Sequence, residues 1–183
     1  MIKGWYNPTT SPEKLLANYI STGKNKYLSL LVEQFNLSIY HYLLSQSNKE
    51  LAEDVVQTTW LKVMKSHSAS QQQSNVKSWL FTIARNTLID EFRRQQKWQS
   101  QLLDENKMLT VNLEKSLQEA DRLTQFNAAL GQLPFLQREA FIFQQEGFSL
   151  NEIAELTNDS FETVKSRLRY ARNNLSHLLG TSS

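Results

Sequence analysis

Residues 149–179 read SLNEIAELTNDSFETVKSRLRYARNNLSHLL and predict two helices joined by a tight turn. Ser149 is a favourable N-cap, and Glu152 three positions later completes a capping box. Residues 157–159 are Thr-Asn-Asp, a turn-forming segment, and Ser160 then stands where a second helix needs its cap. We therefore expect a short helix, a turn and a longer helix in this stretch.

The longer helix has one apolar stripe and a polar, basic remainder. The stripe follows steps of four and three residues, as on one side of an α-helix, and comprises Val164, Leu168, Ala171, Leu175 and Leu178. No acidic residue follows Glu162 in this helix, whereas four lysines and arginines do. Such a helix, anchored by a short partner, suits the major groove of DNA. An ordinary amphipathic helix with a hydrated basic face gives the same pattern.

The composition favours an all-helical globular protein of one domain or two small ones. The chain has 183 residues, of which 40% are hydrophobic, with only five glycines and three prolines. The absence of cysteine excludes disulfides and thiolate metal sites. The first residues do not form a signal peptide, and no apolar run approaches the length of a membrane span. We expect a soluble, cytoplasmic protein without membrane insertion of its own.

Helical periodicity recurs along the rest of the chain. It predicts helices over residues 12–21, 26–45, 49–66, 76–98, 119–132 and 136–146. The pattern weakens and becomes polar after residue 98, which indicates a linker. We place that linker at 99–122, between an N-terminal domain (1–98) and a C-terminal domain (123–183). The expected fold is all-α: two small helical domains joined by a flexible linker, the second ending in a helix-turn-helix.

The helix predicted over 49–66 carries two different faces. Val56, Trp60 and Val63 form an apolar face that suits the core. The second face lies far around the helix and consists of Asp54, Gln57 and Leu61. A leucine exposed among polar groups is a signal of protein docking. On the residues alone, a simply hydrated second face is the favoured interpretation.

The helix predicted over 76–98 also has two sides. One side is an apolar stripe comprising Leu80, Ala84, Leu88 and Phe92, flanked by Phe81. The other carries Trp79, Ile83, Asn86, Asp90, Arg93 and Lys97. Trp79 is suited to stacking on an unpaired base, Asn86 to a base edge, and the two cations to phosphates. The alternative is that Trp79 and Ile83 pack against the preceding helices. Arg85 lies off this face, where it suits a structural ion pair.

Taken together, these segments resemble a bacterial RNA polymerase sigma factor of the extracytoplasmic-function (ECF) type. Four stretches in the right order carry the resemblance: AEDVVQTTWLKVM (52–64), WLFTIARNTLIDEFRR (79–94), LGQLPFLQREAFIFQQEGFSLNEIAEL (130–156) and ETVKSRLRYARNNL (162–175). The resemblance implies a first domain that docks on core RNA polymerase and melts the minus-10 promoter element. It implies a second domain that reads the minus-35 element as duplex.

The resemblance also assigns roles by position. It implies that polymerase docking uses Asp54, Gln57 and Leu61. It implies that the minus-10 strand is bound by Trp79, Asn86, Arg93, Arg94 and Lys97. It implies that the minus-35 major groove is contacted by Glu162, Thr163, Lys165, Ser166, Arg169 and Tyr170.

The partners implied are core RNA polymerase and promoter DNA. Many family members are also held inactive by an anti-sigma factor, which the resemblance adds as a further partner. The family has no cofactor and no catalytic chemistry of its own, since polymerase makes the bonds. Two alternatives stay open on the sequence: a free-standing helix-turn-helix regulator and an interaction protein that does not bind DNA. The 79–94 stretch argues against the first, because such a regulator needs no strand-melting face.

Overall fold

The structure is a computed structural model, which describes residues 10–66, 75–102 and 121–180, without the side chains of 97–102 and 121–122. The described residues form helices and no strand, which confirms the all-α prediction. The helices are α1 (Pro12–Thr22), α2 (Asn25–Gln46), α3 (Lys49–Lys65), α4 (Val76–Leu102), α5 (Asp121–Gln132), α6 (Phe135–Gln145), α7 (Leu150–Thr157) and α8 (Phe161–Leu178). Most of the predicted linker, residues 103–120, lies outside the described residues.

The helix ends follow the capping residues in the sequence. The Ser11 side chain accepts a hydrogen bond from the backbone of Lys14 at the start of α1, and Gly23, at φ 65°, ends that helix. Asn48 caps α3 by accepting from the backbone N–H of Leu51, with 2.9 Å between the atoms. A cap of this kind stabilises a helix by about 1 kcal/mol. The predicted helix boundaries therefore hold to within one or two residues at most ends.

Two details differ from the expectation. Helix α4 continues to Leu102 rather than ending near residue 98, because residues 99–102 contain no glycine or proline and glutamine and leucine are good helix formers. Leu178 was predicted to be buried, but its exposed fraction is 42%. Helix α8 ends at Leu178, and the following Leu179 packs against the smaller core instead.

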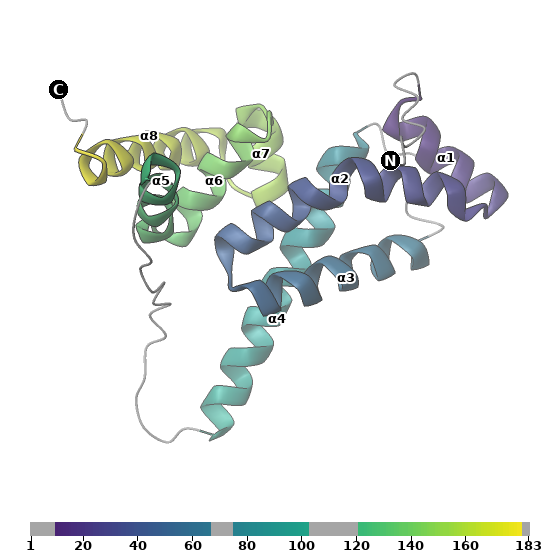
Figure 1. Cartoon of the computed structure of the whole chain (residues 1–183), viewed down its shortest axis with the longest axis horizontal. Coiled ribbons are helices and arrows are strands. Elements are labelled where there is room, and N and C mark those ends of the chain that lie inside the picture. Colours follow the sequence, from purple (N-terminus) through teal and green to yellow (C-terminus); the bar gives the residue numbers. More distant parts are fainter. Residues whose placement is uncertain (1–9, 67–74, 103–120, 181–183) are drawn as a thin grey trace.

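The helices form two groups that lie against each other. Figure 1 shows α1–α4 on one side and α5–α8 on the other. Helix α2 contacts α6, and α4 contacts α7. One continuous hydrophobic core contains residues of α1–α4 together with residues of α6–α8. A smaller core joins α5 to α8 through Ala129, Leu133, Ala171 and Leu175. The two predicted domains are thus packed together in this structure.

None of the helices within the described parts of the chain combines the length and apolarity needed to cross a lipid bilayer.

Candidate nucleic-acid and polymerase interfaces

Helices α7 and α8 form the predicted helix-turn-helix. Ser149 and Glu152 make both hydrogen bonds of the capping box at the start of α7. These bonds, first from the Ser149 backbone and then from its side chain, lower the pKa of Glu152. Asn158 ends α7 in the left-handed conformation, at φ 57° and ψ 44°, which asparagine tolerates better than most residues. Ser160 then accepts from the backbone N–H of Thr163 and starts α8.

An ion pair fixes the turn to the second helix. The Arg167 guanidinium donates two hydrogen bonds to the Asp159 carboxylate, and Nη2 lies 3.0 Å from Oδ1. Both side chains are mostly buried. Burial raises the pKa of Asp159, but hydrogen bonds from Arg167 and Thr157 outweigh burial and lower it overall. Arg167 is therefore occupied in positioning α8.

The remaining basic residues of α8 differ in the groups that they contact. The Arg172 guanidinium donates to the Gln144 side chain of α6 across 2.7 Å. Arg172, Lys165 and Arg169 are all exposed, and Lys165 Nζ lies 3.9 Å from Glu162 Oε2 of the same helix. The Arg169 guanidinium lies 5.1 Å from the centre of the Tyr170 ring, a cation–π contact on the outer face. The exposed cations of α8 are therefore Lys165, Arg169 and Arg172, and Arg172 bonds to a neighbouring helix.

All six residues predicted to contact the minus-35 element lie at or near the outer surface of α8. Glu162, Lys165, Arg169 and Tyr170 are exposed, and Thr163 and Ser166 are half-buried. The Thr163 hydroxyl lies 2.8 Å from the Ser160 hydroxyl, so it also belongs to the helix cap. The apolar stripe up to Leu175 is buried against the neighbouring helices. The structure therefore presents this predicted set together on one accessible helix.

The predicted minus-10 residues of α4 differ more in their exposure to solvent. Asn86 is exposed, whereas Trp79 and Ile83 are half-buried and pack against the core. Arg93 and Arg94 are exposed and pair within the helix with Asp90 and Glu91, as the (i, i+3) spacing allows. Such exposed pairs contribute about 0–1 kcal/mol, so the cations remain available to phosphates. Lys97 belongs to α4, but its side chain lies outside the described residues.

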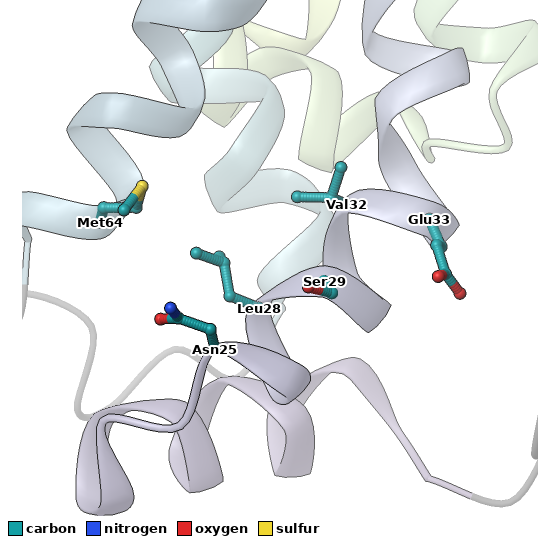
Figure 2. Close-up of a pocket in the computed structure, with 6 residues that line it drawn as sticks. All are labelled: Asn25, Leu28, Ser29, Val32, Glu33 and Met64. Atoms are coloured by element: carbon teal, nitrogen blue, oxygen red, sulfur yellow. The ribbon is translucent and has the colours of Figure 1, made fainter.

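The predicted docking residues of α3 share an exposed surface. Asp54, Gln57 and Leu61 are all exposed, and 53% of Leu61 is accessible to solvent. The predicted apolar face is buried: Trp60 packs in the core, and its indole N–H donates to the Asn36 side chain across 2.9 Å. Met64, three residues after Leu61 on α3, lines an open groove of about 440 Å³ together with residues of α2. Figure 2 shows Leu28 extending from α2 towards Met64 of α3 in this groove.

One polar cluster between the two helix groups was not predicted from the sequence. An ion pair was expected for Arg85, but its partner was not identified. The partner is Glu139 of α6, a fully buried carboxylate to which the Arg85 guanidinium donates two hydrogen bonds, of 2.9 and 3.1 Å. Tyr42 of α2 donates a third. Glu139 lies three and four positions from Leu136, Phe135, Ile142 and Phe143, so a carboxylate on the apolar side of the predicted helix was the available signal.

The fold, with an N-terminal helical domain and a C-terminal helix-turn-helix presenting exposed cations, defines a two-domain DNA-binding protein of the sigma-70 class. Residues 31–98 match the family Sigma-70 region 2, and residues 123–175 match Sigma-70, region 4. The chain belongs to the ECF RNA polymerase sigma factors. It therefore directs RNA polymerase to promoters.

Three relatives illustrate the similarity. The chain is 34% identical over 133 residues to ECF RNA polymerase sigma factor EcfG of Rhodopseudomonas palustris (strain TIE-1), covering 72% of this chain and 73% of the relative. It is 28% identical over 148 residues to ECF RNA polymerase sigma factor SigX of Bacillus subtilis (strain 168), covering 74% and 75%. Among solved structures, the sigma factor RpoE of Bartonella quintana, crystallised with the anti-sigma factor NepR, matches with a TM-score of 0.73. That match has 30% identity and covers 86% of this chain and 99% of RpoE.

Proposed function

We propose that α8 enters the major groove of the minus-35 promoter element and reads it as duplex. The observation that carries this proposal is the division of the basic residues on α8. Arg167 and Arg172 bond to side chains outside α8, whereas the exposed Lys165 and Arg169 contact Glu162 and Tyr170 of α8 itself. Arginine and lysine on an accessible helix are the side chains that reach guanine edges and phosphates in the major groove. In this proposal Glu162, Thr163 and Ser166 complete the contact surface.

The outer side of α4 engages the minus-10 element after melting. Asn86 is exposed and can form hydrogen bonds to the edge of an extruded base, whose unstacking requires a few kcal/mol. Trp79 offers only its outer part for stacking, because the rest of the ring packs on the core. Arg93, Arg94 and Lys97 follow along the same helix and would hold the phosphates of the strand.

The exposed surface of α3 docks on core RNA polymerase. Asp54, Gln57 and Leu61 combine a charge, an amide and a large apolar side chain without any role in the core. An apolar side chain surrounded by polar groups is typical of a protein contact. The chain itself supplies no catalytic step in this scheme. Polymerase forms the phosphodiester bonds.

We further propose that a cytoplasmic anti-sigma protein, or the cytoplasmic part of one, binds this chain. The support is the Bartonella quintana RpoE structure, which contains the anti-sigma factor NepR and aligns with 86% of this chain. We also propose that the chain consists of an N-terminal domain (1–98) and a C-terminal domain (123–183), joined by a linker at 99–122.

The decisive experiment combines the purified chain with core RNA polymerase. Co-purification is measured first, and run-off transcription on a genomic promoter library follows. Binding together with new start sites supports the proposal, and alignment of the start sites supplies both promoter elements. A folded chain that fails to bind core polymerase refutes the docking assignment. Duplex binding without polymerase binding would instead favour a free-standing regulator.

A further inference from the structure

An aromatic side chain at the start of α8 is partly open to solvent. Phe161 is the first residue of α8, directly after the Ser160 cap, and its exposed fraction is 42%. Leu168, seven residues later on nearly the same side of the helix, has an exposed fraction of only 2%. Among the described residues, neither hydrophobic core includes Phe161. The packing that covers the apolar stripe of α8 therefore does not account for this ring.

Phe161 continues the row of exposed cations on α8. Residues four positions apart on an α-helix are neighbours on its surface, with about 5–6 Å between their Cβ atoms. Phe161, Lys165 and Arg169 follow one another at this spacing, and all three are exposed. The row extends about 12 Å along the helix, with the phenyl ring at its N-terminal end. An apolar ring and two cations thus share the surface that is proposed to face DNA.

The first turn of α8 is the part of the helix that suits contact with base edges. In helix-turn-helix proteins the second helix lies in the major groove, and the residues near its N-terminus contact the bases. Phe161 lies in that turn, whereas Arg169 and Tyr170 lie about two turns later. The Tyr170 ring also has a polar neighbour, because the Arg169 guanidinium lies 5.1 Å from its centre. The Phe161 ring carries no polar atom and suits an apolar group.

The chemistry of the major groove identifies that apolar group. Base pairs present hydrogen-bond donors and acceptors there, and thymine adds its C5-methyl group. Contact between a phenylalanine ring and this methyl group is one of the recurring forms of direct readout. Lys165 and Arg169 suit guanine acceptors or phosphates, so they do not distinguish thymine. Phe161 therefore supplies a kind of recognition that the cations beside it lack.

We propose that Phe161 contacts the C5-methyl group of a thymine in the minus-35 element and makes the chain prefer an A·T pair at that position. The inference rests on the proposed entry of α8 into the major groove. The ring and the methyl group exclude water from each other, which favours binding. Cytosine in place of thymine lacks the methyl group and brings an amino donor beside the ring, where it loses its hydrogen bonds to water.

The test removes the methyl group alone. Deoxyuridine pairs with adenine as thymine does but lacks the C5-methyl group. Promoter fragments are prepared from a promoter that run-off transcription identifies, each with one minus-35 thymine replaced by deoxyuridine. The affinity of the complex between the chain and core polymerase is measured by competition with the unmodified fragment. At one position the affinity is expected to fall by roughly 4-fold, the factor that burial of a single methyl group contributes.

Phe161→Ala completes a double-mutant cycle with the modified DNA. This variant is expected to bind the unmodified fragment more weakly by at least the same factor. It is also expected to lose the response to deoxyuridine at that position, because the methyl group no longer has a ring to contact. If Phe161→Ala loses helical structure by circular dichroism, Phe161→Gln replaces it, with the same loss of response expected.

The matched control is Leu178→Ala at the other end of α8. Leu178 has the same exposed fraction as Phe161, 42%. It lies about 25 Å from Phe161 along the helix, far from the row of cations. Leu178→Ala is expected to keep both the affinity of the parent protein and its response to deoxyuridine.

Four results would overturn the inference. The first is an unchanged affinity for every deoxyuridine fragment, and the second is a minus-35 element without thymine. The third is an equal response in the parent protein and Phe161→Ala, which would assign the methyl contact to another side chain. The fourth is equal affinity for a fragment with a scrambled minus-35 element, which overturns the proposed function of α8 as well. The first three leave binding dependent on the minus-35 sequence, so the two kinds of failure are distinguishable.

Discussion

Two arginines on α8 allow the DNA-reading surface to be separated from the residues that hold it in place. Arg169 is exposed and stacks only on Tyr170, so Arg169→Ala should remove a DNA contact and little else. Loss of an arginine contact to a base edge costs about 1–3 kcal/mol, or roughly 5- to 150-fold in affinity. Surface substitutions of this kind change stability by about 0.5 kcal/mol at most. We therefore expect weaker binding to the minus-35 duplex at nearly constant Tm.

Arg167→Ala is the matched comparison, two residues away on the same helix. It removes two hydrogen bonds to the mostly buried carboxylate of Asp159. Charged hydrogen bonds of this kind contribute about 1.5–3 kcal/mol. At about 2–4 °C per kcal/mol for a chain of this size, Tm should fall by roughly 3–12 °C.

The assay pairs fluorescence anisotropy on a labelled minus-35 duplex with thermal unfolding followed by circular dichroism. Binding is measured at a temperature where both variants are folded. A reversed pattern of affinity and Tm changes would refute the assignment of Arg169 to DNA contact and of Arg167 to stability. A large Tm loss for Arg169→Ala would mean that its side chain supports the fold, and an affinity loss for Arg167→Ala equal to that of Arg169→Ala would mean that both contact DNA.

Three further predictions concern the other surfaces. Asp54→Ala and Leu61→Ala should each weaken binding to core polymerase in a pull-down while lowering Tm by only a few degrees, because both side chains are exposed; a large stability loss would contradict this. Trp79→Ala should reduce promoter opening, seen as permanganate reactivity of thymines, more than duplex recruitment. It should also lower Tm, because part of the ring packs on the core. Ser149 and Asn75 lower the pKa of Glu152 below its usual 4.5, so its contribution to stability is present above pH about 4.5 and is lost as pH falls through the lower folded pKa. Glu152→Gln should flatten the fall of Tm with acid, and an unchanged profile would exclude that contribution.

The local structure was predictable because local signals specify it. Ser149 and Glu152 predicted the capping box at α7, and Ser160 predicted the start of α8; the structure contains both. The helical period of apolar residues identified the buried stripe of α8 as far as Leu175. The period does not show which residues of the stripe are covered by other helices, and Leu178, in the last turn of α8, was wrongly expected to be buried. The roles of the predicted site residues stay predictions, although the exposure of Asn86 and Arg169 is compatible with them.

The packing of one domain on the other could not be predicted from the same signals. Periodicity shows that a face is apolar, but it does not identify the surface that covers that face. Phe143 and Phe81 would have looked equally suitable for the core of their own domain. Arg85 and Glu139 are 54 positions apart, and nothing in the local sequence joins them. Because the pairing is long-range, only the three-dimensional arrangement reveals it.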